Sequence, residues 1–219
     1  MPDKLSSVLT VRRHPERAVS DRAVALGVLD EAQVCHVGFT HGGRPWVIPT
    51  TYGRDGDLLY LHGSPLSRMN QTLISGVDLC VTVTLLDGLV LARSAFAHSM
   101  NYRSVVVIGQ AAEVRDRAAK LKAMQCIVEH VLPGRWSEVR PPTQKEVDAT
   151  IVLSLPLDDL STKVRTGPPL DASGDRALPI WAGELLLRGG FDAPRSAPEL
   201  HSGTRIPVSV SAALAKATA

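Results

Sequence analysis

The chain has 219 residues, 44% of them hydrophobic and 21% charged, and a formal net charge of +2. This length suits one domain with a self-sufficient core, and the composition excludes wholesale disorder. Lysines and arginines are scattered among the acids, and only 4% of the residues are aromatic. Nucleic-acid binding, which needs a concentrated basic face interleaved with aromatic rings, is therefore not expected.

Three cysteines, Cys35, Cys80 and Cys126, lie in apolar contexts without the spacing of metal ligands. We expect buried, reduced thiols, with no disulfide framework and no metal site. Residues 1–30 lack the pattern of a signal peptide, and no apolar run is long enough to span a membrane. These features predict a soluble, cytoplasmic protein that does not bind membranes.

Residues 1–19 are polar and are expected to form an arm on the surface. Ser20 can cap a short helix that ends near Glu31. Three β-rich segments follow, at residues 34–39, 46–52 and 58–62, joined by tight-turn signals such as His41-Gly42-Gly43. Strands joined by such short turns predict an antiparallel meander.

Residues 63–73 are predicted to form a loop and a short helix. A hairpin is expected next, with strands at 77–85 and 89–93 and Asp87-Gly88 as its turn. The longest β-like run covers residues 102–114. Apolar side chains along one face predict a helix from Asp116 to about Leu132, which Pro133-Gly134 would end.

A short helical turn that opens with residues 141–143 and two final strands at 150–157 and 161–164 complete the predicted elements. Six to eight short antiparallel strands with few peripheral helices predict a mainly β fold, a small barrel, because closure removes exposed sheet edges. No GxGxxG motif follows a first strand, so a dinucleotide-binding fold is not expected. The predicted organisation is an N-terminal arm (1–19), a barrel domain (20–190) and a C-terminal extension of low order (191–219).

The first candidate site lies where a strand runs into a loop, at residues 60–68. Ser64 and Ser67 can donate hydrogen bonds to phosphate oxygens, and Arg68 can add a charge-assisted fork. The amides at the start of the following helix would point at the same anion. An ordinary helix cap with a solvated arginine explains these residues equally well.

A second polar run, residues 98–104, directly precedes an apolar strand. Arg103 and Ser104 can complete an anion site, and Tyr102 offers a ring face and a hydroxyl group. The alternative is an exposed strand entry with alternating polarity. No Ser/His/acid arrangement stands out, so nucleophilic hydrolysis is not indicated, and His98 alone fits a polar rim better than a base.

Lys163 and Arg165 form a third candidate, because alternation along a strand sends both cations to one face. Two adjacent like charges cost energy unless an anion or a carboxylate meets them. A solvent-facing pair at a strand end is the alternative. Trp181 can be either a packing anchor or a residue that stacks on a ring.

Together these segments resemble the flavin-nucleotide-binding branch of the pyridoxamine 5′-phosphate oxidase-like family, a group that includes the nitroimidazole-resistance proteins. The resemblance covers about residues 10–190. It is carried by Trp-Val-Ile-Pro-Thr-Thr-Tyr at 46–52, Tyr-Leu-His-Gly-Ser at 60–64, residues 98–106, Lys-Val-Arg-Thr-Gly-Pro at 163–168 and Trp-Ala-Gly at 181–183. The stretch Met-Asn-Tyr-Arg-Ser at 100–104 is the most specific part.

The resemblance implies a split β-barrel that forms a homodimer and binds two flavin mononucleotides (FMN) in the clefts between subunits. The residues it places beside the isoalloxazine ring are Val47, Ile48, Pro49 and Thr50. Those near the ribityl phosphate are His62, Ser64, Ser67 and Arg68. Further contacts, some from the neighbouring subunit, would come from Asn101, Tyr102, Arg103 and Ser104. The residues that would cover the ring are Lys163, Arg165 and Trp181.

Two departures limit what the resemblance implies. The Arg-rich substrate signature of true pyridoxamine-phosphate oxidases is not recognisable, so that reaction is not expected. Pro65 and Leu66 stand where small residues are usual, and no second cation follows Arg68. The leading hypothesis is an FMN-dependent oxidoreductase acting on a small molecule, with no residue assigned as a general base. The alternatives are a non-catalytic flavin- or haem-binding or sensing protein and a reductase that uses the deazaflavin F420.

Overall fold

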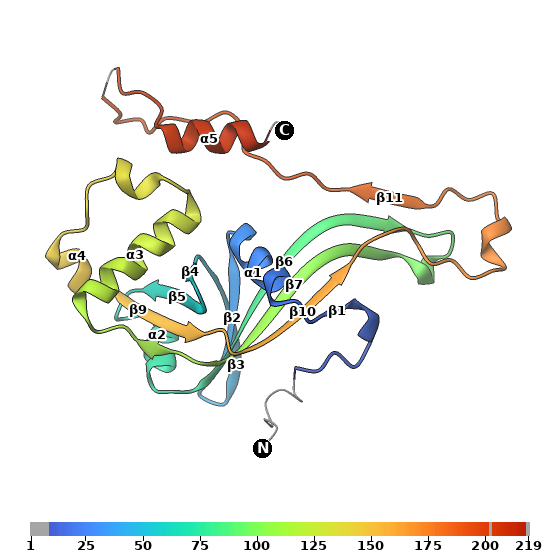
Figure 1. Ribbon diagram of the computed structural model, residues 1–219, viewed down its shortest axis with the longest axis horizontal. Coiled ribbons are helices and arrows are strands. Elements are labelled where there is room, and N and C mark those ends of the chain that lie inside the picture. Colours follow the sequence, from blue (N-terminus) through green and yellow to red (C-terminus); the bar gives the residue numbers. More distant parts are fainter. Residues whose placement is uncertain (1–8, 202, 218–219) are drawn as a thin grey trace.

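Two antiparallel sheets form the body of the protein (Figure 1). The computed structural model describes residues 9–201 and 203–217. The larger sheet runs β1-β10-β7-β6-β2-β3, with β11 paired to β6, and the smaller sheet runs β4-β5-β9-β8. This arrangement confirms the predicted mainly β, antiparallel split barrel. Over the described residues the two sheets are not joined into a closed cylinder.

The larger sheet contains β1 (Ala18–Val19), β2 (Cys35–His41), β3 (Arg44–Thr50), β6 (Asp78–Leu91), β7 (Ser99–Gln110), β10 (Asp159–Arg165) and β11 (Gly183–Leu186). The smaller sheet contains β4 (Gly53–Asp55), β5 (Leu58–Gly63), β8 (Ala112–Glu113) and β9 (Ile151–Pro156). The α-helices are α1 (Arg22–Glu31), α2 (Arg68–Ile74), α3 (Arg117–Val131), α4 (Gln144–Asp148) and α5 (Val208–Ala217). The 3-10 helices are η1 (Pro15–Arg17), η2 (Ala95–Ala97), η3 (Arg135–Glu138) and η4 (Asp175–Ala177).

The predicted hairpin with a turn at Asp87-Gly88 is wrong, because β6 continues through both residues to Leu91. The β6–β7 register shifts between Leu86 and Gly88, so this pair forms a bulge within the strand. An added Cβ at Gly88 would lie 2.9 Å from the carbonyl oxygen of Leu185, so glycine lets β11 approach β6 closely. The chain reverses instead between Leu91 and Ser99, where η2 lies.

The main core lies between the two sheets. Leu59 and Leu61 of β5 enter it from the smaller sheet, and Val81 and Val107 enter it from the larger sheet. The hydroxyl group of the fully buried Tyr52 donates to the carbonyl oxygen of Leu29 at 2.5 Å, which fastens α1 to this core. Period-2 alternation along each strand therefore fixes which side chains face the barrel interior.

Helix α3 covers the outer face of the smaller sheet, where Tyr60 and Val152 pack against Ala123 and Ile127. It begins after Asp116, close to the predicted start, and the Asp116 carboxylate accepts a hydrogen bond from the Ala119 amide at 2.8 Å. Side chains that alternate along β5 thus face two different environments, the barrel core on one side and α3 on the other.

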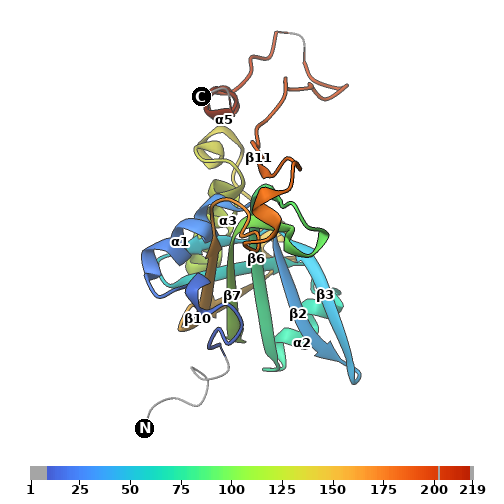
Figure 2. The ribbon, with the colours of Figure 1, turned by 90° about the vertical axis from the view of Figure 1, so that its right-hand side faces the viewer.

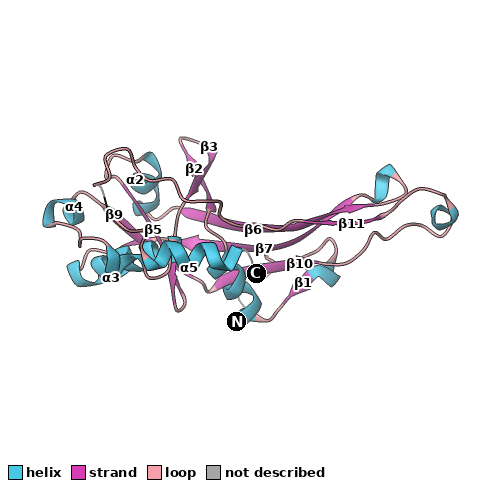
Figure 3. Ribbon diagram, turned by 90° about the horizontal axis from the view of Figure 1, so that it is seen from above, coloured by secondary structure: helices cyan, strands magenta, loops and turns pink. Residues whose placement is uncertain are grey.

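The strands β6 and β7 extend far beyond the barrel (Figures 1 and 3). We call this projection, residues 85–101 together with residues 166–187, the arm. It is distinct from the N-terminal arm predicted at residues 1–19. Figure 2 looks along the arm and shows β3 at one edge of the larger sheet and β10 toward the other, where β1 pairs with it. β11 runs along the arm, pairing with β6 from Gly183↔Leu91 to Leu186↔Gly88.

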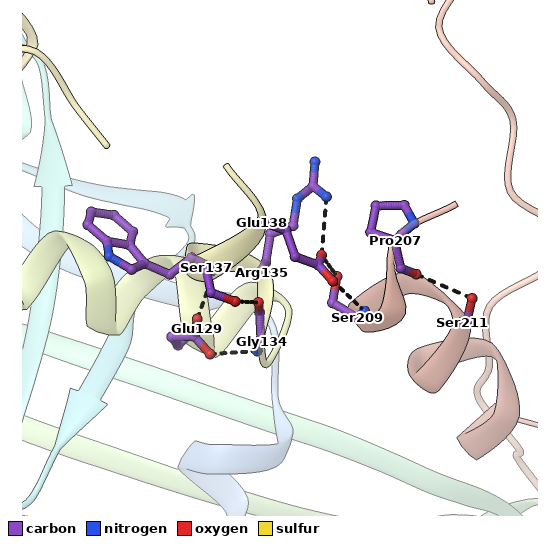
Figure 4. A network of polar contacts seen from close by, with 9 residues as sticks. Glu129, Gly134, Arg135, Ser137, Glu138, Pro207, Ser209 and Ser211 are labelled. Atoms are coloured by element: carbon purple, nitrogen blue, oxygen red, sulfur yellow. Dashed lines mark hydrogen bonds and ion pairs between the residues drawn. The ribbon is translucent and has the colours of Figure 1, made fainter. Parts of the chain in front are cut away.

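Helix α5 lies within residues 191–219, for which the sequence predicts low order, and it contacts η3 (Figure 4). The carboxylate of Glu138 accepts hydrogen bonds from the Ser209 amide at 3.0 Å and from the Ser209 hydroxyl group. A contact between residues 71 positions apart has no local sequence signal. In the described part of the chain, no helix has both the length and the apolar character needed to cross a membrane.

Candidate functional site

Strand β3 forms one end of the larger sheet, so one of its edges has no strand partner among the described residues. Val47 is 65% exposed, and Ile48 and Thr50 are half-buried. A free edge offers backbone N–H and C=O groups at alternate residues, although Pro49 contributes no N–H. The edge of β3 can therefore exchange hydrogen bonds with the polar rim of a flat ring.

Arg68, at the start of α2, contacts a side chain of β3. Its guanidinium carbon is 4.3 Å from the centroid of the Trp46 ring in β3, which is cation–π distance. Ser67 precedes it as the N-cap of α2, and its side chain makes no capping hydrogen bond. The structure therefore brings Arg68 onto the Trp46 side chain of β3, and Ser67 stands one residue before it at the start of α2.

The loop that carries Ser64 is held by the side chains of α2. Asn70 is fully buried and donates from Nδ2 to the Ser64 carbonyl oxygen at 3.1 Å. The Ser64 hydroxyl oxygen accepts from the Leu66 amide at 3.1 Å. An added Cβ at Gly63 would lie 2.6 Å from Asn70 Nδ2, so glycine is needed for this close approach. The loop is thus shaped before any ligand binds.

His62 lies apart from this group. Leu59 and Leu61 face the barrel core, whereas Tyr60 and His62, which alternate with them, face α3. The His62 ring lines a cavity of about 380 Å³ between β5, α3 and the segment from Trp136 to Glu146, and none of residues 64–68 lines it. The structure does not bring His62 to the other side chains predicted to approach the phosphate.

The His62 ring has an unusual environment. Its Nδ1 is buried and makes no hydrogen bond within the described residues. Burial lowers the pKa of His62 below its usual value, which keeps the ring neutral near pH 7. A buried polar atom without a partner costs about 1–3 kcal/mol and calls for an explanation. A neutral imidazole beside a cavity is the form that binds metal ions.

The predicted groups on β7 and β10 lie opposite one another, with Ser104 opposite Lys163 and Tyr102 opposite Arg165. The guanidinium of Arg103 is already engaged by two carboxylates, at 2.7 Å to Asp87 Oδ1 and 2.5 Å to Glu31 Oε2. These contacts raise the pKa of Arg103. Within the protomer Arg103 therefore fastens α1 and β6 to β7.

Arg165 is only 7% exposed, and its hydrogen-bond acceptors are neutral. It donates to the Asn101 side-chain oxygen, to the Gly167 carbonyl oxygen at 2.7 Å and to the Pro168 carbonyl oxygen at 3.0 Å. Asn101 in turn donates to Glu184 of β11 at 2.5 Å. Asn101 and Arg165 thus connect β7, β10 and β11 at the base of the arm.

Trp181 is 67% exposed and lies on the arm, where an added Cβ at Gly183 would be 2.9 Å from its ring. Lys163 directs its ammonium group to the Arg13 carbonyl oxygen at 3.4 Å. Two strands, β6 and β2, separate β7 from β3 in the sheet order. One protomer therefore presents the predicted ring-binding residues as two separate groups, one at β3 and α2 and one at β7, β10 and the arm.

Residues 21–164 match the family model described as pyridoxamine 5′-phosphate oxidase. The chain belongs to this pyridoxamine 5′-phosphate oxidase family. The resemblance expected from residues 46–52, 60–64 and 98–106 is thereby confirmed. No curated protein matches the sequence significantly.

Two solved structures of this family resemble the chain over nearly its whole length. The flavocytochrome Anf3 from Azotobacter vinelandii is 38% identical, with a TM-score of 0.90, covering 96% of this chain and 98% of its own. The FAD and haem binding protein from Mycobacterium smegmatis is 35% identical, with a TM-score of 0.87. This match covers 90% of this chain and 97% of the Mycobacterium smegmatis chain. A putative 5-nitroimidazole antibiotic resistance protein from Bacteroides thetaiotaomicron is 26% identical, with a TM-score of 0.56, covering 67% and 86%.

The family model ends at residue 164, before the returning half of the arm and before α5. The two long matches leave at most a tenth of this chain uncovered, so much of this C-terminal part has a counterpart in them. The sequence did not predict the contact of Trp46 with Arg68 or that of Asn70 with the Ser64 loop, because both depend on how α2 packs in the folded chain. It named His62 but not its cavity.

Proposed function

We propose that the protein is a redox protein that binds a flavin nucleotide and haem. The observation that carries the flavin part is the open edge of β3 beside Ser67 and Arg68. The haem part is carried by the His62 ring, which lines a cavity with largely apolar walls and whose buried Nδ1 makes no hydrogen bond within the described residues. Both parts are supported by the two long matches, one named a flavocytochrome and the other an FAD and haem binding protein.

The flavin site combines the parts that such a cofactor requires. Bound flavin supplies hydride and electron transfer, so the protein has to bind and orient it and need not provide a general base. The edge of β3 offers backbone groups to the polar rim of the ring. Arg68, held by Trp46, offers a cation to a phosphate group, and Ser67 offers a hydroxyl group.

We expect the flavin to be FAD in preference to the FMN implied by the sequence, because the Mycobacterium smegmatis protein is named for FAD. Acid release followed by mass spectrometry distinguishes FAD, FMN and F420 by mass. Release of F420 would point to the deazaflavin alternative. The residues at β3 and α2 contact parts that FAD and FMN share, so their assignment holds for either.

The residues around His62 fit haem. The ring is neutral, and Met124, Ile127, Val128 and Trp136 give the cavity apolar walls. Bound haem iron supplies one-electron chemistry. His62 would hold the iron through a ring nitrogen, and the apolar walls would exclude water from the macrocycle.

A second copy of the chain would complete the flavin site. The predicted ring-covering residues lie on β7, β10 and the arm, away from β3, so another protomer can supply them. The arm also exposes large apolar side chains that a partner would cover, among them Leu86, Met100, Trp181, Leu185 and Leu186.

Light scattering coupled to size exclusion should give twice the chain mass of 23.5 kDa. A mass of one chain in the coloured protein would contradict the dimer.

The direct test is the absorption spectrum of the purified protein. We expect flavin bands and a Soret band, with one flavin and one haem per chain after reconstitution. Anaerobic addition of a reduced nicotinamide should bleach the flavin bands, and an acceptor should restore them. A coloured protein that never bleaches would support the storage or sensing alternative. A protein that stays colourless when offered both cofactors would overturn the proposal.

His62 has its own test. His62→Phe removes the ring nitrogens and keeps the cavity apolar, so the Soret band should disappear while the flavin bands remain. His36→Phe is the matched control, since His36 lies exposed on β2 and should not affect the Soret band. Circular dichroism shows whether each variant is folded. An unchanged Soret band in folded His62→Phe would place the haem elsewhere.

A further inference from the structure

A second cavity, of about 720 Å³, lies between the arm and the N-terminal segment around η1. Three segments meet there: the chain around η1, the β6–β7 connection around η2, and the loop that follows β10. None of the residues of the β3 edge and none of the His62 cavity lines it. This cavity is therefore separate, within the protomer, from the β3 edge and from the His62 cavity, and it shares Arg165 with the predicted ring-covering residues.

Three guanidinium groups line this cavity, from Arg13, Arg17 and Arg165. Among the described residues, Asp175 is the one carboxylate that lines it. Arg165 donates to neutral acceptors, and no ion pair holds it among the described residues. Arg17 is 20% exposed on its side chain and has a loose contact of 3.8 Å with Glu16. The cavity wall therefore carries more positive than negative charge.

The two less exposed arginines are close enough to repel each other. Burial, followed by the charge of Arg17, lowers the pKa of Arg165, and the charge of Glu184 opposes this only in part. Glu184 is itself engaged by Asn101. Like charges held together are costly unless an anion meets them. A phosphate or diphosphate group would relieve this repulsion and could accept from several guanidinium donors.

An exposed aromatic ring lies at the edge of the cavity. Phe96 of η2 is 99% exposed, an unusual position for a large apolar side chain. The turn that carries it is fixed by a hydrogen bond from His98 Nδ1 to the Ser94 carbonyl oxygen at 2.9 Å. Aromatic faces stack on flat heterocycles. Phe96 is thus placed to contact a base at the edge of a basic cavity.

The N-terminal wall is held in a strained backbone conformation. His14 has φ of 57°, and it is the only described residue other than glycine with a positive φ. Such conformations cost about 1–3 kcal/mol and persist where the surrounding structure requires them. His14 directly precedes η1, which ends at Arg17, and its Nδ1 lies 2.9 Å from Glu16 Oε1. The strained turn orients Arg13 and Arg17 toward the same cavity.

We infer that this cavity binds the nucleoside diphosphate part of a ligand, with the phosphates between Arg13, Arg17 and Arg165 and the base against Phe96. Two sources can supply this chemistry: a separate nucleotide or the adenosine diphosphate half of the flavin cofactor. With a separate nucleotide the inference goes beyond the proposed function, whereas with the adenosine diphosphate half of FAD it rests on that function and locates a further part of the cofactor.

Adenosine diphosphate (ADP), titrated into the protein as purified, is the probe, and calorimetry gives the Kd. Arg17→Gln should weaken ADP binding by about tenfold, which corresponds to one lost charge-assisted contact. Phe96→Ala should weaken ADP binding but leave the binding of inorganic pyrophosphate unchanged. Arg115→Gln is the control, because Arg115 is 81% exposed on its side chain and pairs only with Glu113, away from the cavity.

The flavin content of the same variants distinguishes the two sources. If ADP binds the flavin-loaded protein, a separate nucleotide occupies the cavity. If ADP does not bind but Arg17→Gln loses FAD while Arg115→Gln retains it, the cavity holds the adenosine diphosphate half of FAD. The inference is overturned if ADP does not bind and Arg17→Gln keeps its flavin, or if Arg17→Gln and Phe96→Ala bind ADP as tightly as the wild type. ADP binding by a protein that never takes up flavin or haem would refute the proposed function alone.

Discussion

The guanidinium carbon of Arg68 lies 4.3 Å from the centroid of the Trp46 ring, and this contact joins the start of α2 to the edge strand β3. A cation over an indole at a partly exposed site gains about 0.5–1 kcal/mol. The larger consequence concerns position. The long, flexible side chain of Arg68 is held next to an open strand edge before any ligand arrives, so less conformational entropy is lost on binding.

Replacing Arg68 should weaken the hold on the flavin without unfolding the barrel. Arg68→Ala removes one charge-assisted contact to phosphate, which we expect to raise the Kd for flavin by about tenfold to a hundredfold. Fluorescence titration of the flavin-free protein measures this Kd. Trp46→Ala keeps the cation but frees it, so its effect should be smaller. Stoichiometric flavin in Arg68→Ala after extensive dialysis would place the phosphate site elsewhere.

Replacing Arg103 should mainly lower stability. Its guanidinium bridges Glu31 of α1 and Asp87 of β6, so Arg103→Ala leaves two carboxylates facing each other without a cation. The side chain is 30% exposed, and we expect the free energy of unfolding to fall by about 1–2 kcal/mol. Denaturant unfolding measures this value. Arg22→Ala is the control, since Arg22 pairs with Asp57 alone on the surface and should change stability by about 0.5 kcal/mol or less.

Most of the fold could be predicted because local patterns specify it. The turn at Gly42 and Gly43, both with positive φ, joins β2 and β3 as the sequence indicates, and Asp116 caps α3. The sequence Asp87-Gly88 led to the wrong prediction of a hairpin, because the same two residues suit both a hairpin turn and a β-bulge. The choice between them depends on β11, about a hundred residues later. Helix α5 could not be predicted for the same reason, since its partner Glu138 is remote in sequence.

The candidate site was predictable where its residues are neighbours in sequence. Ser67 and Arg68 follow β5 after the short loop 64–66, and the structure brings Arg68 onto Trp46 of β3. The environment of His62 was not predictable, because a strand end can turn a side chain to either face. The ion pairs of Arg103 with Glu31 and Asp87 were also not predictable from the sequence, since these two carboxylates come from α1 and β6. The cofactor-binding role of each predicted residue stays a prediction.

Stability should decrease at acidic pH through His62. Burial lowers the pKa of His62 in the folded protein below the ordinary 6.5, so between these values the unfolded chain binds a proton that the folded protein does not. The free energy of unfolding therefore falls as the pH drops below about 6.5. The haem-free His62→Phe variant should show a shallower pH dependence from pH 7 to 5 in denaturant titrations. An identical slope in His36→Phe and His62→Phe would contradict this.

The docking of α5 should depend on Glu138. Hydrogen bonds from the Ser209 hydroxyl group and amide lower the pKa of Glu138, so the contact persists at neutral pH and weakens as the pH falls through that lowered pKa (Figure 4). Glu138→Gln should increase amide hydrogen exchange in residues 208–217 and accelerate proteolysis before α5. Ser211→Ala is the control, because its hydroxyl group bonds only the Pro207 carbonyl oxygen. Equal protection in both variants would show that the helix is held by its apolar contacts alone.

A methyl group at Gly88 should release β11 from the arm. An added Cβ would meet the Leu185 carbonyl oxygen at 2.9 Å and the Leu186 Cα at 3.3 Å, both backbone atoms that cannot turn aside. In Gly88→Ala we expect the amides of residues 183–186 to exchange about tenfold faster, with Trp181 fluorescence shifted toward that of a solvated indole. Gly27→Ala is the matched control: nothing lies within 4 Å of its added Cβ inside α1, so stability should rise by about 0.5–1 kcal/mol. Unchanged protection of residues 183–186 in Gly88→Ala would mean that β11 can shift along β6 without losing its pairing, and that the bulge rather than the glycine sets the geometry of the arm.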